Sequence, residues 1–168
     1  GKAVAREVVL SAAEWQQVLA KGDPVLNIHI PGGAPLAHDR CGASIGQALG
    51  FFPRHFPQRP FAAFCCGSWI LNTWLQAALP PTANLVRFQR EFYLFPIHLS
   101  GEWALRNVFG EIPADLARAP RDTQLRRAML DRLASGEAIP TGGGGCFLLP
   151  QDFRWGEQIY LNQQLPLD

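Results

Sequence analysis

An uninterrupted apolar segment, Phe61–Gly67 (FAAFCCG), constrains the fold more than any other part of this sequence. The segment carries no charge, is too short for a buried helix, and lies between Pro60 and Ser68. These features are typical of a strand that is covered on both faces at the centre of a sheet. We therefore expect a central strand here, followed by a helix that Ser68 caps and that runs from Trp69 to Leu79.

Alternating strand and helix patterns continue on both sides of this segment. The expected strands are Arg6–Leu10, Pro24–Ile30, Phe92–Leu99, Cys146–Leu149 and a last one near 157–161. The expected helices are Ser11–Ala20, Asp39–Phe56 with a kink or early end at Pro53, Asn84–Arg90, Glu102–Phe109 and Thr123–Ser135. Gly142–Gly145 is expected to form a flexible turn. This order of elements predicts an α/β fold.

The bulk composition indicates one domain with a substantial core. The chain has 168 residues, of which 48% are hydrophobic and 17% charged. Its net charge of +1, without a basic cluster, argues against nucleic acid or an anionic membrane surface as a partner. No apolar run reaches the roughly 18 residues that a membrane helix needs.

The four cysteines suggest neither a disulfide scaffold nor a metal site. They are Cys41, Cys65, Cys66 and Cys146, and they form no CxxC pair. Reduced thiols in a cytoplasmic protein are the expected state. Structural zinc prefers two tight ligand pairs, and only His38 and Cys41 form one, so we expect no metal.

Five short blocks, in their order and spacing, carry a resemblance to a known family. The blocks are Ile28–Pro31, Phe51–Phe52, Phe64–Leu71, Ala83–Gln89 and Thr123–Ala128. Together they resemble the C-terminal, GNAT-like domains of bacterial acyltransferase proteins, over about residues 6 to 149. The resemblance implies a central mixed β-sheet flanked by helices on both faces. It also implies acyl transfer from a coenzyme A thioester to an amine.

The same resemblance bears on domain organisation. It implies that residues 1–168 form one GNAT-like domain, the C-terminal part of a longer protein whose N-terminal domain is a partner. One departure from the family pattern matters here. GNAT proteins usually hold the coenzyme A pyrophosphate with a Gly-rich loop, and Pro31–Ala34 follows a strand but lacks that spacing. A non-catalytic domain that supports a partner acyltransferase domain therefore stays open as an alternative.

Three residues are candidates for catalysis, and each also has a structural interpretation. His29 would be a general base, because histidine titrates near neutral pH, or a polar residue on one face of a strand. Ser68 would protonate a leaving thiolate or would only cap a helix. Cys66, near the expected start of a helix, would be the nucleophile of a cysteine-dependent hydrolase or a small core residue.

Further residues are candidates for binding. Gly32, Gly33 and Trp69 are expected to contact the acyl-CoA substrate. A polar group formed by Asn84, Arg87 and Gln89 would bind substrate, dock the second domain, or be the solvated face of a helix. The many aromatic residues near turns would leave an apolar surface that also allows a homodimer.

Overall fold

The sheet of this protein is mixed and has four strands, in the order β1-β2-β4-β3. The computed structural model describes residues 7, 9–33, 35–98, 100–139 and 143–159. β1 (Val25–Asn27) runs parallel to β2 (Ala63–Ser68), whereas β4 (Gly143–Leu148) runs antiparallel between β2 and β3 (Tyr93–Ile97). The α/β class, the mixed sheet and the central position of the Phe61–Gly67 segment are thus confirmed.

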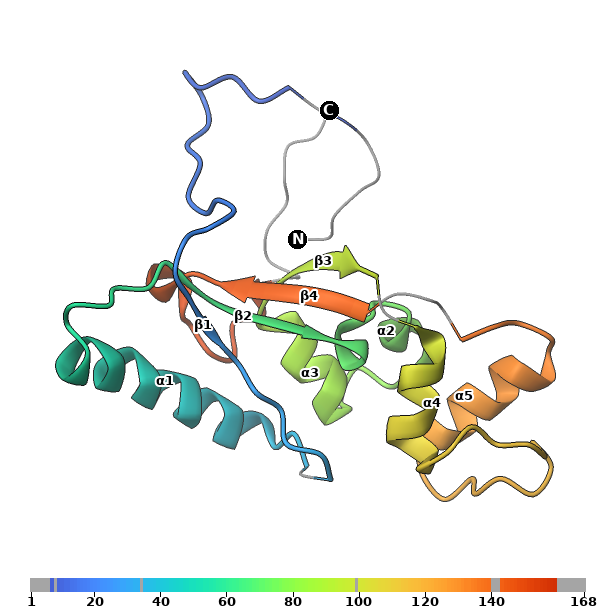
Figure 1. The fold of residues 1–168 in the computed structure, drawn as a ribbon. Helices are drawn as coiled ribbons and strands as arrows, with labels where there is room; N and C mark the ends of the chain where they lie inside the picture. Colours follow the sequence, from blue (N-terminus) through green and yellow to red (C-terminus); the bar gives the residue numbers. More distant parts are fainter. Residues whose placement is uncertain (1–6, 8, 34, 99, 140–142, 160–168) are drawn as a thin grey trace.

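Helices flank this sheet, as expected. They are α1 (His38–His55), the 3₁₀ helix η1 (Trp69–Leu71), α2 (Leu75–Ala78), α3 (Asn84–Arg90), α4 (Gly101–Phe109), α5 (Gln124–Ala134) and the 3₁₀ helix η2 (Pro150–Asp152). α1 and α3 lie along one side of the sheet, and α4 and α5 form a pair at one end of it (Figure 1).

The main core lies between the sheet and the two helices α1 and α3. Alternate residues of a strand point to the same face, and Phe64 and Cys66 of β2 meet Leu148 and Cys146 of β4 in this way. Further buried members of this core are Ile45, Ile70, Leu71, Phe88, Phe92 and Leu94. Burial of this apolar face holds β2 and β4 at the centre of the fold.

The stop signals of the sequence locate several elements well. Thr123 caps α5, because its hydroxyl oxygen accepts a hydrogen bond from the Arg126 N–H at 3.1 Å. Pro53 lies inside α1, which ends two residues later at His55. β3 is an edge strand, which explains how it accommodates Pro96.

The predictions for the N-terminal segment are wrong. Neither the described part of the predicted strand Arg6–Leu10 nor the predicted helix Ser11–Ala20 is regular structure; only a single turn forms, in which the Ser11 carbonyl accepts from the Glu14 and Trp15 N–H groups. The apolar side chains of this segment belong to none of the hydrophobic clusters that the described residues form, and Val18 is 53% exposed. A short helix that lacks such packing is marginal in water, whatever its capping residues.

The predicted helix Trp69–Leu79 is also wrong, because Asn72 divides it into η1 and α2. Ser68 does cap the first piece. Between the pieces, the buried Gln89 side chain donates from Nε2 to the carbonyls of Ile70 and Asn72. These carbonyls therefore have a tertiary partner in place of the intrahelical one.

The predicted glycine turn is a third error. Gly143–Gly145 belong to β4, and the need for glycine comes from close packing. A Cβ atom at Gly144 would clash with the backbone carbonyl of Leu71. The last predicted strand is not seen in 157–159, and 160–161 lie outside the described residues. Within the described residues, no helix is both long and apolar enough to cross a membrane.

Candidate functional site

The two parallel strands β1 and β2 separate at their carboxyl ends, and this separation opens a cavity. The last hydrogen bond that joins them runs from the Ile28 N–H to the Cys65 carbonyl, at 2.8 Å. β2 continues to Ser68, paired on its other side with Gly144 of β4. The chain that follows β1 meanwhile turns away toward α1 (Figure 1).

The separation leaves backbone polar groups of β2 facing the cavity. Backbone groups alternate between the two edges of a strand. Because the Cys65 carbonyl points toward β1, the N–H and C=O of Gly67 point to the same side. Gly67 is exposed and lines the cavity. It therefore presents one donor and one acceptor to a bound molecule.

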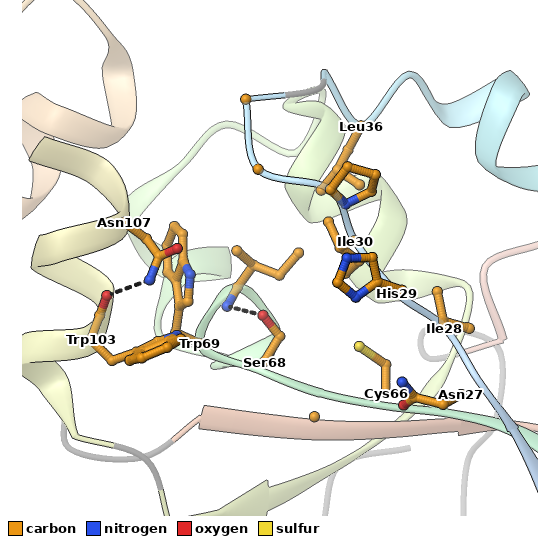
Figure 2. Close-up of a pocket in the computed structure, with 15 residues that line it drawn as sticks. Asn27, Ile28, His29, Ile30, Leu36, Cys66, Ser68, Trp69, Trp103 and Asn107 are labelled. Atoms are coloured by element: carbon orange, nitrogen blue, oxygen red, sulfur yellow. Dashed lines mark hydrogen bonds between the residues drawn. The ribbon is translucent and has the colours of Figure 1, made fainter. Parts of the chain in front are cut away.

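This cavity has a volume of about 470 Å³ and brings six predicted site residues together (Figure 2). They are His29, Gly32, Gly33, Cys66, Ser68 and Trp69. They meet because Ile28–Gly33 follows β1, Cys66–Ser68 ends β2, and Trp69 comes directly after β2. Carboxyl ends of neighbouring parallel strands lie at one edge of a sheet, where ligands commonly bind.

Sequence reasoning missed the other lining residues of the same cavity, among them Asn27, Gly67, Trp103 and Asn107. Trp103 and Asn107 come from α4, which lies far along the chain from β2. Trp103 is 58% exposed at the rim. Only the packing of α4 against η1 brings these side chains to the cavity, and the sequence contains no local signal for it.

Ser68 caps a helix, which is one of the two roles that its sequence position suggested, and it also lines the cavity. Its hydroxyl oxygen accepts the Ile70 N–H at 3.5 Å and so caps η1. A serine hydroxyl also carries a proton that it can donate. Since Ser68 lines the cavity, that proton is available to a bound molecule.

Cys66 lies at the floor of the cavity and is paired across strands with Cys146. The hydrogen bond from the Cys146 thiol lowers the pKa of Cys66, although burial acts in the opposite direction. The same hydrogen bond, together with burial, raises the pKa of Cys146 well above its usual value. The two thiols thus differ in acidity, with Cys66 the more easily ionised.

This pairing predicts how Cys66 reacts with an alkylating agent. In Cys146→Ala, the donor is lost, so the pH at which Cys66 becomes reactive should rise. Cys146→Ser keeps a donor and should behave more like the unmodified chain. Iodoacetamide labelling at a series of pH values, read at Cys66 by peptide mass spectrometry, measures this. Identical profiles for the alanine and serine variants would contradict the predicted influence of Cys146.

The predicted polar group on α3 does not reach the cavity. Asn84 is exposed, and Gln89 is fully buried against η1. The Arg87 Nη2 donates to Nδ1 of His38 at 2.9 Å. Their predicted contact with a substrate or a second domain stays a prediction.

The described part of the chain contains no group of three or more His, Cys, Asp or Glu side chains that could hold a metal ion. The cavity itself is lined by polar side chains and backbone groups. It offers an exposed imidazole, a hydroxyl, a thiol and the backbone amide of Gly67.

Several solved acyltransferases are similar in structure. An acyltransferase in complex with decanoyl-CoA is 30% identical, with a TM-score of 0.68; the match covers 79% of this chain and 42% of that one. An acyltransferase in complex with CoA and 10C-teicoplanin is 25% identical, with a TM-score of 0.67, and the match covers 76% of this chain and 41% of that one. This chain therefore spans less than half the length of these proteins. No curated protein sequence matches it.

A match to a protein family covers most of the chain. Residues 4–146 match the family described as the GNAT-like C-terminal domain. The matched range includes all of the cavity-lining residues named above. This chain belongs to the family of GNAT-like C-terminal domains.

Proposed function

We propose that this domain binds an acyl-CoA in the cavity between β1 and β2 and promotes transfer of its acyl group to an amine. The observation that carries the proposal is the opened edge of β2, where Gly67 and Ser68 face His29 and the glycine turn across one cavity. The similar acyltransferases that were solved with decanoyl-CoA and with CoA support the choice of ligand.

In the proposed reaction, the amine nitrogen attacks the thioester carbonyl carbon directly. The Gly67 N–H donates to the carbonyl oxygen as negative charge develops on it. His29 accepts the proton that the amine loses, and the Ser68 hydroxyl donates a proton to the departing CoA thiolate. Holding both reactants in one cavity supplies the proximity that such a transfer requires.

The rest of the coenzyme would extend from this centre toward α1. Its amide-containing arm can pair with the Gly67 carbonyl, which β1 leaves free. The diphosphate would lie at the Gly32–Gly33 turn and the start of α1, where Ala37 provides no side-chain cap. The first backbone N–H groups of a helix favour an anion. Trp69 would flank the arm from the other wall of the cavity.

Calorimetric titration with decanoyl-CoA tests the proposal. Saturable binding is expected, and Ser68→Ala should weaken it about 2- to 10-fold, the usual effect of losing one hydrogen bond. Ser100→Ala is the matched control, because Ser100 also caps a helix, by accepting the Glu102 N–H at 3.2 Å, but does not line the cavity. Equal affinities for the two variants would contradict a role of Ser68 in binding.

A substitution at His29 distinguishes an effect on the rate of acyl transfer from an effect on the affinity for the acyl-CoA. With an amine acceptor present, release of free CoA thiol follows the transfer. His29→Ala should slow this release while leaving the affinity for decanoyl-CoA within about two-fold, because a base acts on the amine and not on the thioester. An unchanged rate in His29→Ala would remove this residue from the mechanism, and absence of decanoyl-CoA binding would overturn the proposed function itself.

A further inference from the structure

A second, smaller cavity lies beside the first. It has a volume of about 200 Å³, and it shares the wall formed by Ile28–Pro31 and Leu36 with the first cavity. Its far end is apolar and closed by Ile45 and Phe88, which are 6% and 2% exposed. The remaining wall comes from the first two turns of α1, including Cys41.

We propose that this second cavity receives the hydrocarbon chain of the acyl group whose thioester lies in the first cavity. The inference rests on the proposed function and adds the position and the length limit of the acyl chain. The wall common to both cavities is made of Ile28–Pro31 and Leu36, in which the side chains of Ile28, Ile30 and Leu36 are aliphatic. An alkyl chain that leaves the thioester past Ile30 would stay in contact with apolar side chains.

The lining of the second cavity does not suit the amine acceptor or the phosphates of the coenzyme. Among the described lining residues, Arg40 carries a permanent charge, and it is exposed. A protonated amine acceptor would be repelled by this guanidinium and would find no carboxylate there. The phosphates of the coenzyme would lose their hydration against Ile45 and Phe88 without a partner. A hydrocarbon chain, in contrast, gains free energy when it leaves water for this lining.

The size of the cavity sets the length of the chain. A methylene group occupies about as much space as a water molecule in the liquid, about 30 Å³, so the cavity holds roughly six or seven methylenes. Each buried methylene contributes about 0.8 kcal/mol, which corresponds to about a four-fold gain in affinity. We therefore expect a preference for acyl groups of medium length.

A series of acyl-CoA thioesters from acetyl to hexadecanoyl tests this inference by calorimetry, with CoA alone as the reference. The dissociation constant should fall about four-fold for each added methylene. The fall should stop at medium length, where the chain reaches Ile45 and Phe88. A dissociation constant that is the same for acetyl-CoA and decanoyl-CoA would overturn the second cavity as the acyl site and leave the proposed function intact.

Two variants test whether the alkyl chain lies in the second cavity. Cys41→Phe fills part of the second cavity and should move the stop to shorter chains, with acetyl-CoA affinity unchanged. Ser44→Trp, at an exposed position of the same cavity, should do the same without altering the core. Ala43→Phe is the control, because Ala43 is exposed on α1 and does not line the cavity. Circular dichroism confirms that each variant is folded.

The outcomes of this experiment separate the two proposals. A shift of the length limit in Cys41→Phe or Ser44→Trp, but not in Ala43→Phe, supports the acyl site. Chain-length dependence that persists unchanged in both folded variants places the alkyl chain elsewhere and overturns the inference. Failure of every thioester to bind would overturn the inference together with the proposed function.

Discussion

Replacing Glu91 with alanine is expected to lower the free energy of unfolding by about 3–5 kcal/mol, because two hydrogen bonds to a carboxylate are lost, each worth about 1.5–3 kcal/mol. Glu91 is 3% exposed at the end of α3. One carboxylate oxygen accepts from His38 Nε2 at 2.8 Å, and the other accepts from the Gly156 N–H at 2.9 Å. In the alanine variant the buried His38 ring would lose its acceptor, whereas the N–H of the exposed Gly156 can bond to water.

The state of His38 follows from its neighbours. Arg87 Nη2 donates to Nδ1 of His38, so Nδ1 is the acceptor and Nε2 carries the proton that bonds to Glu91. The His38 imidazole thus lies between a guanidinium and a carboxylate. This chain of hydrogen bonds ties the start of α1 to the end of α3 and to the segment around Gly156.

Chemical denaturation, followed by the fluorescence of the five tryptophans, measures this effect. Glu91→Gln is the matched variant: it keeps an acceptor oxygen for one of the two donors and should cost about 1–3 kcal/mol. Glu102→Ala, on an exposed position of α4, should change stability by less than about 0.5 kcal/mol. A loss below about 1 kcal/mol in Glu91→Ala would show that the pair contributes little to the fold.

The parts of the fold that could be predicted are those with local signals. The apolar segment that becomes β2 needs no partner to be recognised, because its composition alone requires burial on both faces. α5 is bounded by a capping threonine and a glycine. The six predicted cavity residues meet because they follow two strands that turned out to be parallel neighbours.

The remaining parts depend on contacts between distant residues. His38 and Glu91 lie 53 positions apart, and nothing near either residue predicts their pairing. The proposed role of the Gly67 backbone depends on which edge of β2 is left unpaired. The order of the strands in the sheet determines this edge. The N-terminal segment shows the opposite case. Ser11 and Glu14 satisfy a capping pattern, but Trp15 and Val18, which are 39% and 53% exposed, belong to none of the hydrophobic clusters of the described residues.

The glycines of α1 give a prediction that also depends on contacts between distant residues, here for the stability change on substitution by alanine. A glycine inside a helix is normally unfavourable by about 0.5–1 kcal/mol relative to alanine. A Cβ atom at Gly42, however, would clash with the Trp155 ring, and no atom lies within 4 Å of the same position at Gly50. Gly50→Ala should therefore stabilise the protein by about 0.5–1 kcal/mol. Gly42→Ala should destabilise it by about 1–3 kcal/mol, the usual cost of overpacking.

Trp155 cannot easily yield to an added methyl group, because several contacts fix it. Its Nε1–H donates to the His38 carbonyl at 2.9 Å, and its ring packs edge-on against Phe88 and Phe92. A double-mutant cycle tests this explanation. In a Trp155→Ala background the clash is gone, so Gly42→Ala should become neutral or stabilising, as at Gly50. If Gly42→Ala is equally destabilising with and without the Trp155 ring, the clash with this ring is not the cause of the destabilisation.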